Sequence, residues 1–186
     1  MKRVIAGLAF ALLLAGCAAL SSRRLDPGLF LLPPSEAGFE ASLTQEVSFE
    51  RGTTRFDSTA IVDVSSTEVV LVGLSPFGTR MLSLIWDGKK LTQERDSSIP
   101  KELPLEFILR DIQLASWPAA AVQAALPGPA WTLRDAASER ILLKDGQVVV
   151  RIRYGGADRL HSDLVFEHLG LGYLLRIHSL RETEEE

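Results

Sequence analysis

The sequence predicts a mainly β domain: a single curved antiparallel sheet that forms an unclosed half-barrel, capped by a short pair of helices. Three observations support this fold class. Apolar and polar residues alternate along many short segments, turn signals rich in glycine separate neighbouring segments, and a helical period replaces the alternation only once, near the middle of the chain. Because strands and helices do not alternate, the pattern does not fit a doubly wound parallel sheet.

Five strands are predicted in the first half of the chain. The first passes through Leu43, Val47 and Phe49 and ends before a turn at Gly52. The dipeptide Asp87-Gly88 is a strong hairpin signal. The remaining strands of this half cover residues 55–64, 67–74, 79–86 and 90–95. The segment 67–74 is apolar on both faces, which predicts that both sides of this strand are covered.

Two helices are predicted after the fifth strand. Leu105, Ile108, Leu109 and Ile112 recur at helical spacing across residues 103–116. The next dipeptide, Trp117-Pro118, stops or kinks this helix, and a proline suits the first position of another. The second helix therefore covers residues 118–126 and ends before Pro127 and Gly128.

Five more strands are predicted in the second half, for a total of about ten. They cover residues 131–134, which form a short strand, and residues 139–144, 147–154, 163–168 and 173–180. Asp145-Gly146 and the run Gly170–Gly172 mark two further hairpins. A sheet of this size, strongly curved and with the helices against its concave face, encloses apolar space.

The N-terminus has the pattern of a secretory signal. Lys2 and Arg3 precede an apolar stretch from Val4 to Ala15, which is shorter than the roughly 20 residues that span a bilayer. The following cysteine completes a Leu-Ala-Gly-Cys sequence that resembles the bacterial lipobox, with Cys17 as the lipidated residue. The alternative is an ordinary signal peptide with a cysteine nearby by chance. The expected organisation is a signal peptide over 1–16, the lipidated cysteine and a tether over 17–37, the half-barrel over 38–181 and an acidic tail over 182–186.

Composition limits the function further. Removal of the signal leaves 170 residues with 18 basic and 24 acidic side chains, which argues against nucleic-acid binding. With Cys17 as the only cysteine, no disulfide forms within the chain. Because no other segment is long and apolar enough to span a bilayer, the protein is expected to be anchored to a membrane through its lipid.

The apolar run from Leu29 to Leu32 interrupts the tether and has two interpretations. It docks on the folded body as an edge strand or plug, which is the favoured interpretation. In the other interpretation it is a second membrane contact beside the lipid.

Residues for catalysis or metal binding are sparse, so no enzyme activity, metal or cofactor is expected. His161, His168 and His178 have no zinc-like spacing, and His168 is more typical of a core or rim position. Ser75 lies in a sequence that approaches the nucleophile elbow, but its second glycine comes one residue late. Ser75 and His168 are the first residues to mutate if the chain is a lipid hydrolase or thioesterase.

Apolar side chains are the stronger candidates for a site. They lie at the ends of predicted elements or on the helices, where they would line or cover a cavity; the alternative is that they fill a dry core. The candidates are Leu74, Phe77, Leu82, Leu84, Trp86, Leu105, Phe107, Ile108, Ile112, Trp117 and Trp131.

Several motifs together carry a family resemblance: the lipobox, Phe77-Gly78-Thr79-Arg80, Leu82-x-Leu84-x-Trp86-Asp87-Gly88-Lys89, Leu103-Pro104-Leu105 and Leu114-Ala115-x-Trp117-Pro118. With these motifs the chain resembles a group of uncharacterised bacterial outer-membrane lipoproteins, often encoded with aryl-polyene biosynthesis genes. More distantly it is similar to the lipoprotein carriers LolA and LolB. The resemblance implies an eleven-stranded half-barrel whose cavity takes acyl chains. Phe77 would stand where LolB uses an exposed leucine on a protruding loop, and Ala18 after the lipidated cysteine implies sorting to the outer membrane.

The expected function is therefore a monomeric lipoprotein anchored to the periplasmic face of the outer membrane of a Gram-negative bacterium. It would bind a hydrophobic lipid or acyl cargo, received from a periplasmic carrier protein, and help its transfer to or insertion in that membrane. The alternative is a structural or scaffold lipoprotein of the cell envelope that binds a protein partner on an exposed sheet edge and has a filled core.

Overall fold

The structure is a computed structural model that describes residues 28, 30–97, 99 and 104–180. Cys17 with its signal, Leu29 and the acidic tail lie outside the described residues.

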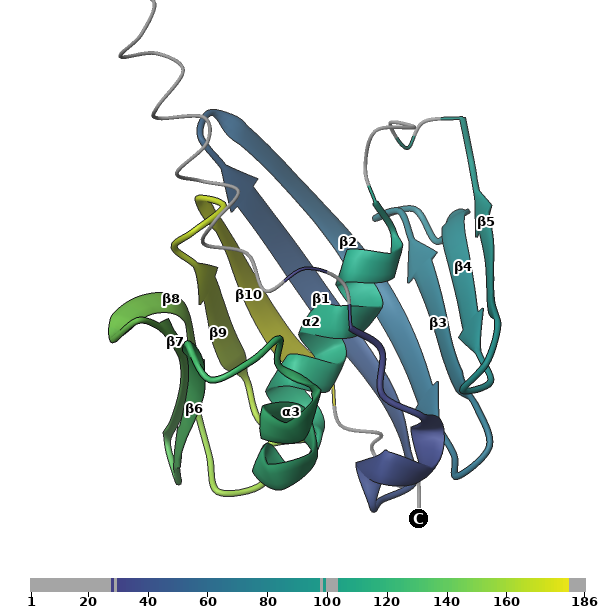
Figure 1. Cartoon of the computed structure of the whole chain (residues 1–186). Helices are drawn as coiled ribbons and strands as arrows, with labels where there is room; N and C mark the ends of the chain where they lie inside the picture. Colours follow the sequence, from purple (N-terminus) through teal and green to yellow (C-terminus); the bar gives the residue numbers. More distant parts are fainter. Residues whose placement is uncertain (1–27, 29, 98, 100–103, 181–186) are drawn as a thin grey trace, which may run out of the picture.

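The described residues form one antiparallel sheet of ten strands in the order β5-β4-β3-β2-β1-β10-β9-β8-β7-β6 (Figure 1). This confirms the predicted half-barrel with two short helices, and the strand count falls one short of the eleven that the resemblance implied. The strands are β1 Ala41–Arg51, β2 Thr54–Val64, β3 Val69–Leu74, β4 Arg80–Trp86, β5 Leu91–Arg95, β6 Trp131–Ala136, β7 Glu139–Lys144, β8 Gln147–Tyr154, β9 Leu164–His168 and β10 Tyr173–Leu180.

The first and last strands of the chain lie side by side at the centre of the sheet. Thr44 of β1 pairs with Leu180 of β10, and seven residue pairs join the two strands. Each half of the chain then extends outward from this centre as a series of hairpins. As a result β5 and β6, which follow each other in the chain apart from the helices, lie at opposite edges of the sheet.

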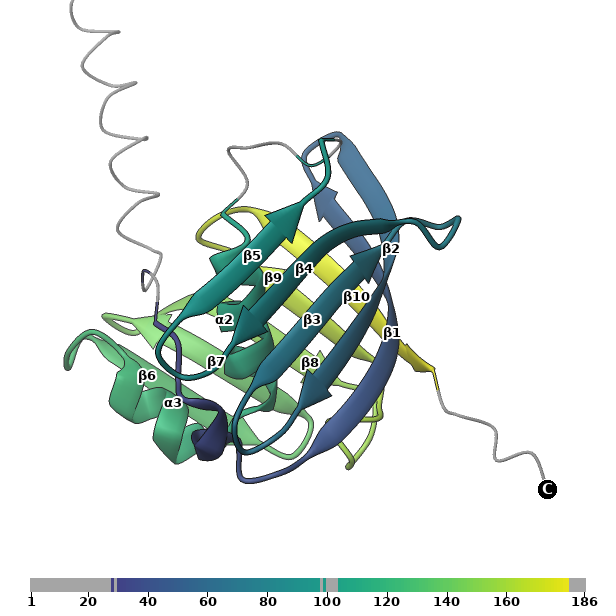
Figure 2. The same cartoon turned by 90° about the vertical axis from the view of Figure 1, so that its right-hand side faces the viewer.

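The helices cross between these two edges over the concave face. Helix α2 (Glu106–Ser116) lies inside the curve of the sheet, and α3 (Ala119–Ala125) lies near β6 (Figure 1). In the side view, β3, β4 and β5 stand in front of α2 (Figure 2). Helix α2 ends because Trp117 takes an extended conformation before Pro118, which confirms the predicted break. Because β5 and β6 lie at opposite edges, the segment between them crosses the concave face, and its two helices form the lid of the sheet.

One continuous core lies between the concave face and α2. Alternate strand residues point inward, since neighbouring side chains on a strand face opposite sides. Leu84, Val149, Leu109 and Trp117 are fully buried there. The η1 turn (Pro34–Ala37) adds Ala37 to the same cluster, although these residues belong to the segment expected to be a tether.

Three details differ from the expectations. Helix α2 begins at Glu106, after a turn at Pro104 and Leu105, and β6 continues to Ala136, two residues beyond its predicted end. The outer side chains of β3, such as Val70 and Val72, are only half-buried, so the expectation that both faces are covered is wrong for the outer face. Apolar side chains on this outer face can still pack against side chains of the neighbouring strands.

Gly73 accommodates an irregularity in the sheet. The pairing of β3 with β4 shifts register between Gly73 and Leu74. A Cβ atom on Gly73 would come within 2.9 Å of Leu82 Cγ, closer than real Cβ contacts allow. The glycine therefore permits Leu82 to fill the core beside the bulge.

Candidate functional site

The apolar residues expected at the site mostly come together in the interior. Leu82, Leu84 and Trp86 project inward from β4, and Leu105, Trp117 and Trp131 are buried with them. Ile108 and Ile112 of α2 are half-buried against the same core, while Leu74 and Phe107 are half-buried. Phe77 lies apart from the cluster, because it occupies the tip of the β3–β4 turn and is 95% exposed.

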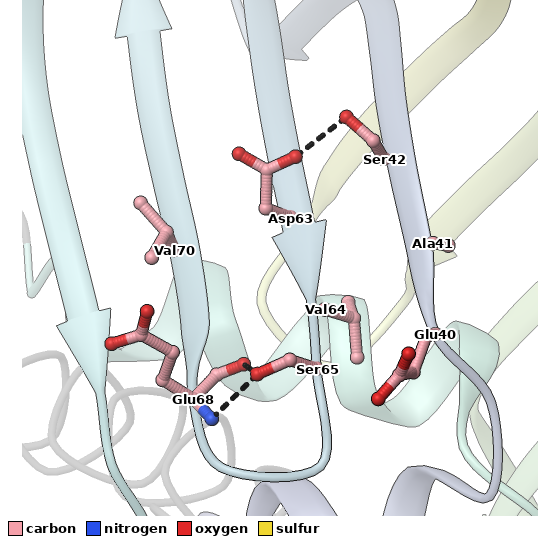
Figure 3. Close-up of a pocket in the computed structure, with 8 residues that line it drawn as sticks. All are labelled: Glu40, Ala41, Ser42, Asp63, Val64, Ser65, Glu68 and Val70. Atoms are coloured by element: carbon pink, nitrogen blue, oxygen red, sulfur yellow. Dashed lines mark hydrogen bonds between the residues drawn. The ribbon is translucent and has the colours of Figure 1, made fainter.

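Two shallow hollows of the described surface lie outside this interior. One, of about 330 Å³, opens where β1, β2 and β3 meet, and its polar lining comes from Glu40, Ser42, Asp63, Ser65 and Glu68 (Figure 3). The other, of about 220 Å³, lies along β4 and β5 between Arg80 and Asp96. Helix α2 lines neither of them. In this conformation, the side chains of α2 and of the N-terminal segment cover the apolar concave face.

The N-terminal segment docks on the body as a strap, defined here as residues 28 and 30–33. It runs beside α2 on the side of β3 and β4 before it reaches η1 (Figure 1). Phe30, Leu31 and Leu32 pack against the hydrophobic core. This confirms the docked interpretation for residues 30–32, as a plug with no strand pairing; Leu29 lies outside the described residues.

Side chains of α2 and β4 hold the backbone of the strap at Leu32. The Leu32 N–H donates to Gln113 Oε1 at 2.8 Å, and Gln113 Nε2 donates to the Leu32 carbonyl at 2.8 Å. Trp86 Nε1 donates to the same carbonyl, also at 2.8 Å. The primary amide of Gln113 thus bonds both polar groups of one residue, as the backbone of a neighbouring strand would. The strap is therefore held without pairing with a strand of the sheet.

A buried polar cluster lies beside the strap. Arg110 and Asp111 of α2 form an ion pair at 2.8 Å, Tyr173 of β10 donates to Asp111 Oδ2, and Arg110 Nη1 donates to the Gly28 carbonyl at 3.2 Å. The ring of His168 on β9 stacks at a tilt against Tyr173, with centroids 5.0 Å apart. A polar group sealed in an apolar interior is stable only when its partners are present, and these side chains supply them to one another.

Burial and the neighbouring charge act in opposite directions on the protonation of Asp111. Burial raises the pKa of Asp111 above its usual 3.8, and the Arg110 charge and the Tyr173 hydroxyl oppose that rise. Burial and the neighbouring Asp111 carboxylate together raise the pKa of Tyr173 far above 10, so its hydroxyl stays protonated. Since a guanidinium keeps its charge, an ionised Asp111 gives a neutral pair, whereas a protonated one would leave Arg110 as an uncompensated buried cation. The pair is therefore ionised.

Side chains of the sheet hold the C-terminal end of α2. Arg140 Nη1 of β7 donates to the Leu114 and Trp117 carbonyls, each at 2.8 Å, and Tyr154 of β8 donates to the Ala115 carbonyl at 2.6 Å. These carbonyls have no partners within the helix, because the last turn lacks the following N–H groups. Asp135 orients Arg140 through its Nε at 2.9 Å. Burial favours a higher pKa for Asp135, but hydrogen bonds from Arg140 and Arg159 outweigh it and hold the pKa below 3.8.

The residues considered for catalysis serve local structure. Ser75 Oγ accepts from the N–H groups of Phe77 and Thr79 in the β3–β4 turn, and His168 is buried on β9, as expected of a core histidine. His161 pairs with Asp158, and His178 with Asp163. The described residues contain no group of three or more potential ligands placed to hold a metal ion.

No helix within the described ranges has the length and apolar character needed to cross a membrane.

Sequence reasoning missed Arg110, Asp111, Gln113 and Arg140. Polar residues on an amphipathic helix normally mark its solvent face. Here Arg110 and Gln113, one turn apart, instead face the strap, which covers that side of α2. The sequence signal that could have found them is the apolar run from Leu29 to Leu32, because an apolar segment that docks on a helix buries the side chains beneath it.

A comparison with protein families finds a match. A family model described as "Protein of unknown function (DUF3261)" matches residues 42–181, which include every strand except the first residue of β1. A search of curated proteins finds no match.

Proposed function

The chain belongs to this DUF3261 family, and we propose that it is an outer-membrane-anchored lipoprotein that binds the acyl chain of a hydrophobic cargo beneath α2 and the strap. It then helps that cargo enter the membrane. The cargo reaches it from a periplasmic carrier, and the lipid on Cys17 is the anchor and not the cargo.

One observation carries the proposal: a broad apolar concave face that α2 and the strap cover. The cover consists of α2 and three apolar strap residues, held by a few side-chain hydrogen bonds to Leu32, Gly28 and the end of α2. An acyl chain that takes the place of Phe30, Leu31 and Leu32 buries similar apolar area, at about 0.8 kcal/mol per methylene group. Exchange of strap for cargo therefore costs little hydrophobic free energy.

The tether keeps this binding face near the membrane. Gly28 lies eleven positions after Cys17 in the sequence, a span of at most about 40 Å when fully extended. Phe77, exposed at the tip of its turn, supplies an apolar side chain that can enter the bilayer interface during transfer.

The experiment is lipid analysis of the full chain carrying Cys17→Ala, which has no thioether lipid of its own. We expect one acyl-bearing lipid class to co-purify, and a polyene fatty-acyl probe to gain fluorescence on binding. Extraction of no lipid, together with no probe signal above that of an unrelated protein, would contradict the proposal.

The second candidate is a scaffold lipoprotein, and the filled interior favours it. Strands β5 and β6 are the edges of the sheet, and a partner's strand can pair with β5 or with the part of β6 that follows Leu133, whose N–H bonds Gln123. A photo-crosslinker at Thr92 of β5 or Arg134 of β6 would then capture one discrete envelope protein. The same crosslinker at Ser48, in the central strand β1, is the matched control. Equal capture from all three positions would count against a scaffold.

A further inference from the structure

The contacts under the strap define what a replacing ligand must offer. Within the described residues, three donors face the strap backbone: Arg110 Nη1, Gln113 Nε2 and Trp86 Nε1. One acceptor, Gln113 Oε1, faces it as well. The strap satisfies them with the carbonyls of Gly28 and Leu32 and with the N–H of Leu32.

A ligand that displaces the strap must replace these partners. The indole and amide groups lie against the core, where an unsatisfied donor is costly because neither water nor protein completes its hydrogen bond. A bare hydrocarbon chain would leave the Gln113 amide and the Trp86 indole without the partners that the strap gives them. A polar head with at least two acceptor oxygens, next to the chain, satisfies the donors as the two strap carbonyls do.

The charge of the cluster restricts that head further. The Arg110 charge is already compensated by Asp111, which the guanidinium contacts through both Nε and Nη2. Tyr173 is protonated, and His168 Nδ1 accepts the Leu171 N–H at 3.2 Å. A carboxylate head would bring an additional negative charge into an apolar interior where Asp111 already compensates the Arg110 charge.

We infer that the site now occupied by the strap selects an amphiphile with an uncharged, oxygen-rich head, such as an acyl ester, over a free fatty acid. Arg110, Gln113 and Trp86 donate hydrogen bonds to the oxygen atoms of that head. Asp111 disfavours an anionic head because it already forms the ion pair with Arg110. This inference rests on the proposed function, because it names the head group of the same cargo.

The test compares two probes that differ only in head charge. cis-Parinaric acid and its methyl ester are titrated at neutral pH into the full chain carrying Cys17→Ala, and the ratio of their dissociation constants is measured. The titration is repeated with Asp111→Asn added, and with Asp63→Asn as the matched control, since Asp63 is exposed on β2 and bonds Ser42. The general preference of a polyene ester for apolar surroundings is the same in all three proteins. The change in ratio therefore isolates the effect of Asp111.

We expect the ester to bind at least about tenfold more tightly than the acid, and Asp111→Asn to abolish or reverse that ratio because Arg110 can then pair with the acid. Asp63→Asn should leave the ratio unchanged. Equal binding of the two probes to the parent chain, or tighter binding of the acid, would overturn the inference while the proposed function stands. That outcome needs no variant, so a misfolded Asp111→Asn protein cannot obscure it. Failure of both probes to bind would overturn the proposed function and the inference with it.

Discussion

The side chain of Gln113 bonds both polar groups of Leu32, accepting from its N–H and donating to its carbonyl, each at 2.8 Å. These residues lie 81 positions apart in the chain. One amide side chain thus joins the strap to α2. Helix α2 is therefore in contact with the sheet on one side and with the strap on another.

Loss of this amide should release the strap. Gln113→Leu keeps the apolar volume but removes both hydrogen bonds, and we expect unfolding free energy to fall by about 1–3 kcal/mol. Hydrogen exchange at the Leu32 amide should accelerate, and polyene probes should bind more readily. Gln123→Leu is the matched control, because Gln123 makes the same paired contact with β6 through Trp131 and Leu133. If Leu32 exchanges equally in both variants, Gln113 does not hold the strap.

Arg140 should matter more to stability than an exposed arginine of the same sheet. Arg140→Met removes the donors from the Leu114 and Trp117 carbonyls, so we expect a loss of about 2–4 kcal/mol in urea denaturation. Arg153→Met breaks only an exposed pair with Glu167 and should cost less than about 1 kcal/mol. Similar losses in the two variants would mean that Arg140 does not anchor the end of α2.

Acid should weaken the anchor of α2 through Asp135. Its pKa is held below 3.8 in the folded protein, so its stabilising contribution is complete above 3.8 and is lost as the pH falls through the folded-state pKa. Asp135→Asn should therefore destabilise the protein at about pH 6 and much less at about pH 3. Denaturant titrations of both proteins at the two pH values measure this. A difference independent of pH would show that the charge of Asp135 is not what stabilises Arg140.

Phe77 should matter to the membrane and not to the fold. Its ring is 95% exposed, so Phe77→Ser should change unfolding free energy by less than about 0.5 kcal/mol. In the Cys17→Ala chain, we expect it to lower co-sedimentation with phospholipid vesicles. Ile85→Thr is the control, since Ile85 is an exposed apolar residue on the body of β4. An unchanged sedimented fraction for Phe77→Ser would remove Phe77 from the transfer step.

Much of the fold could be predicted because its elements are local. The alternation through Leu43, Val47 and Phe49 marks β1, and Asp145-Gly146 marks the β7–β8 hairpin. The break at Trp117-Pro118 separates the two helices for a steric reason that involves adjacent residues only. The candidate apolar residues of the interior were also predictable, since inward-facing strand positions repeat with a period of two.

The rest depended on contacts that no local pattern contains. The pairing of Thr44 with Leu180 joins segments from opposite ends of the described chain and places the two halves on either side of a central seam. That pairing sends β5 and β6 to opposite edges and so forces α2 across the concave face. Arg110 and Gln113 then become buried, although their types indicated a solvent face.

The sequence by itself determined which segments are strands and helices and where the chain turns, and it predicts a lipid anchor at Cys17. Only the tertiary structure decided that the strap covers α2, that Arg110 and Asp111 form a neutral pair in the interior, and that Phe77 stands outside it. The physical reason is that periodicity and turn chemistry act between near neighbours in the chain. Burial of a polar side chain depends on which distant segment lies against it.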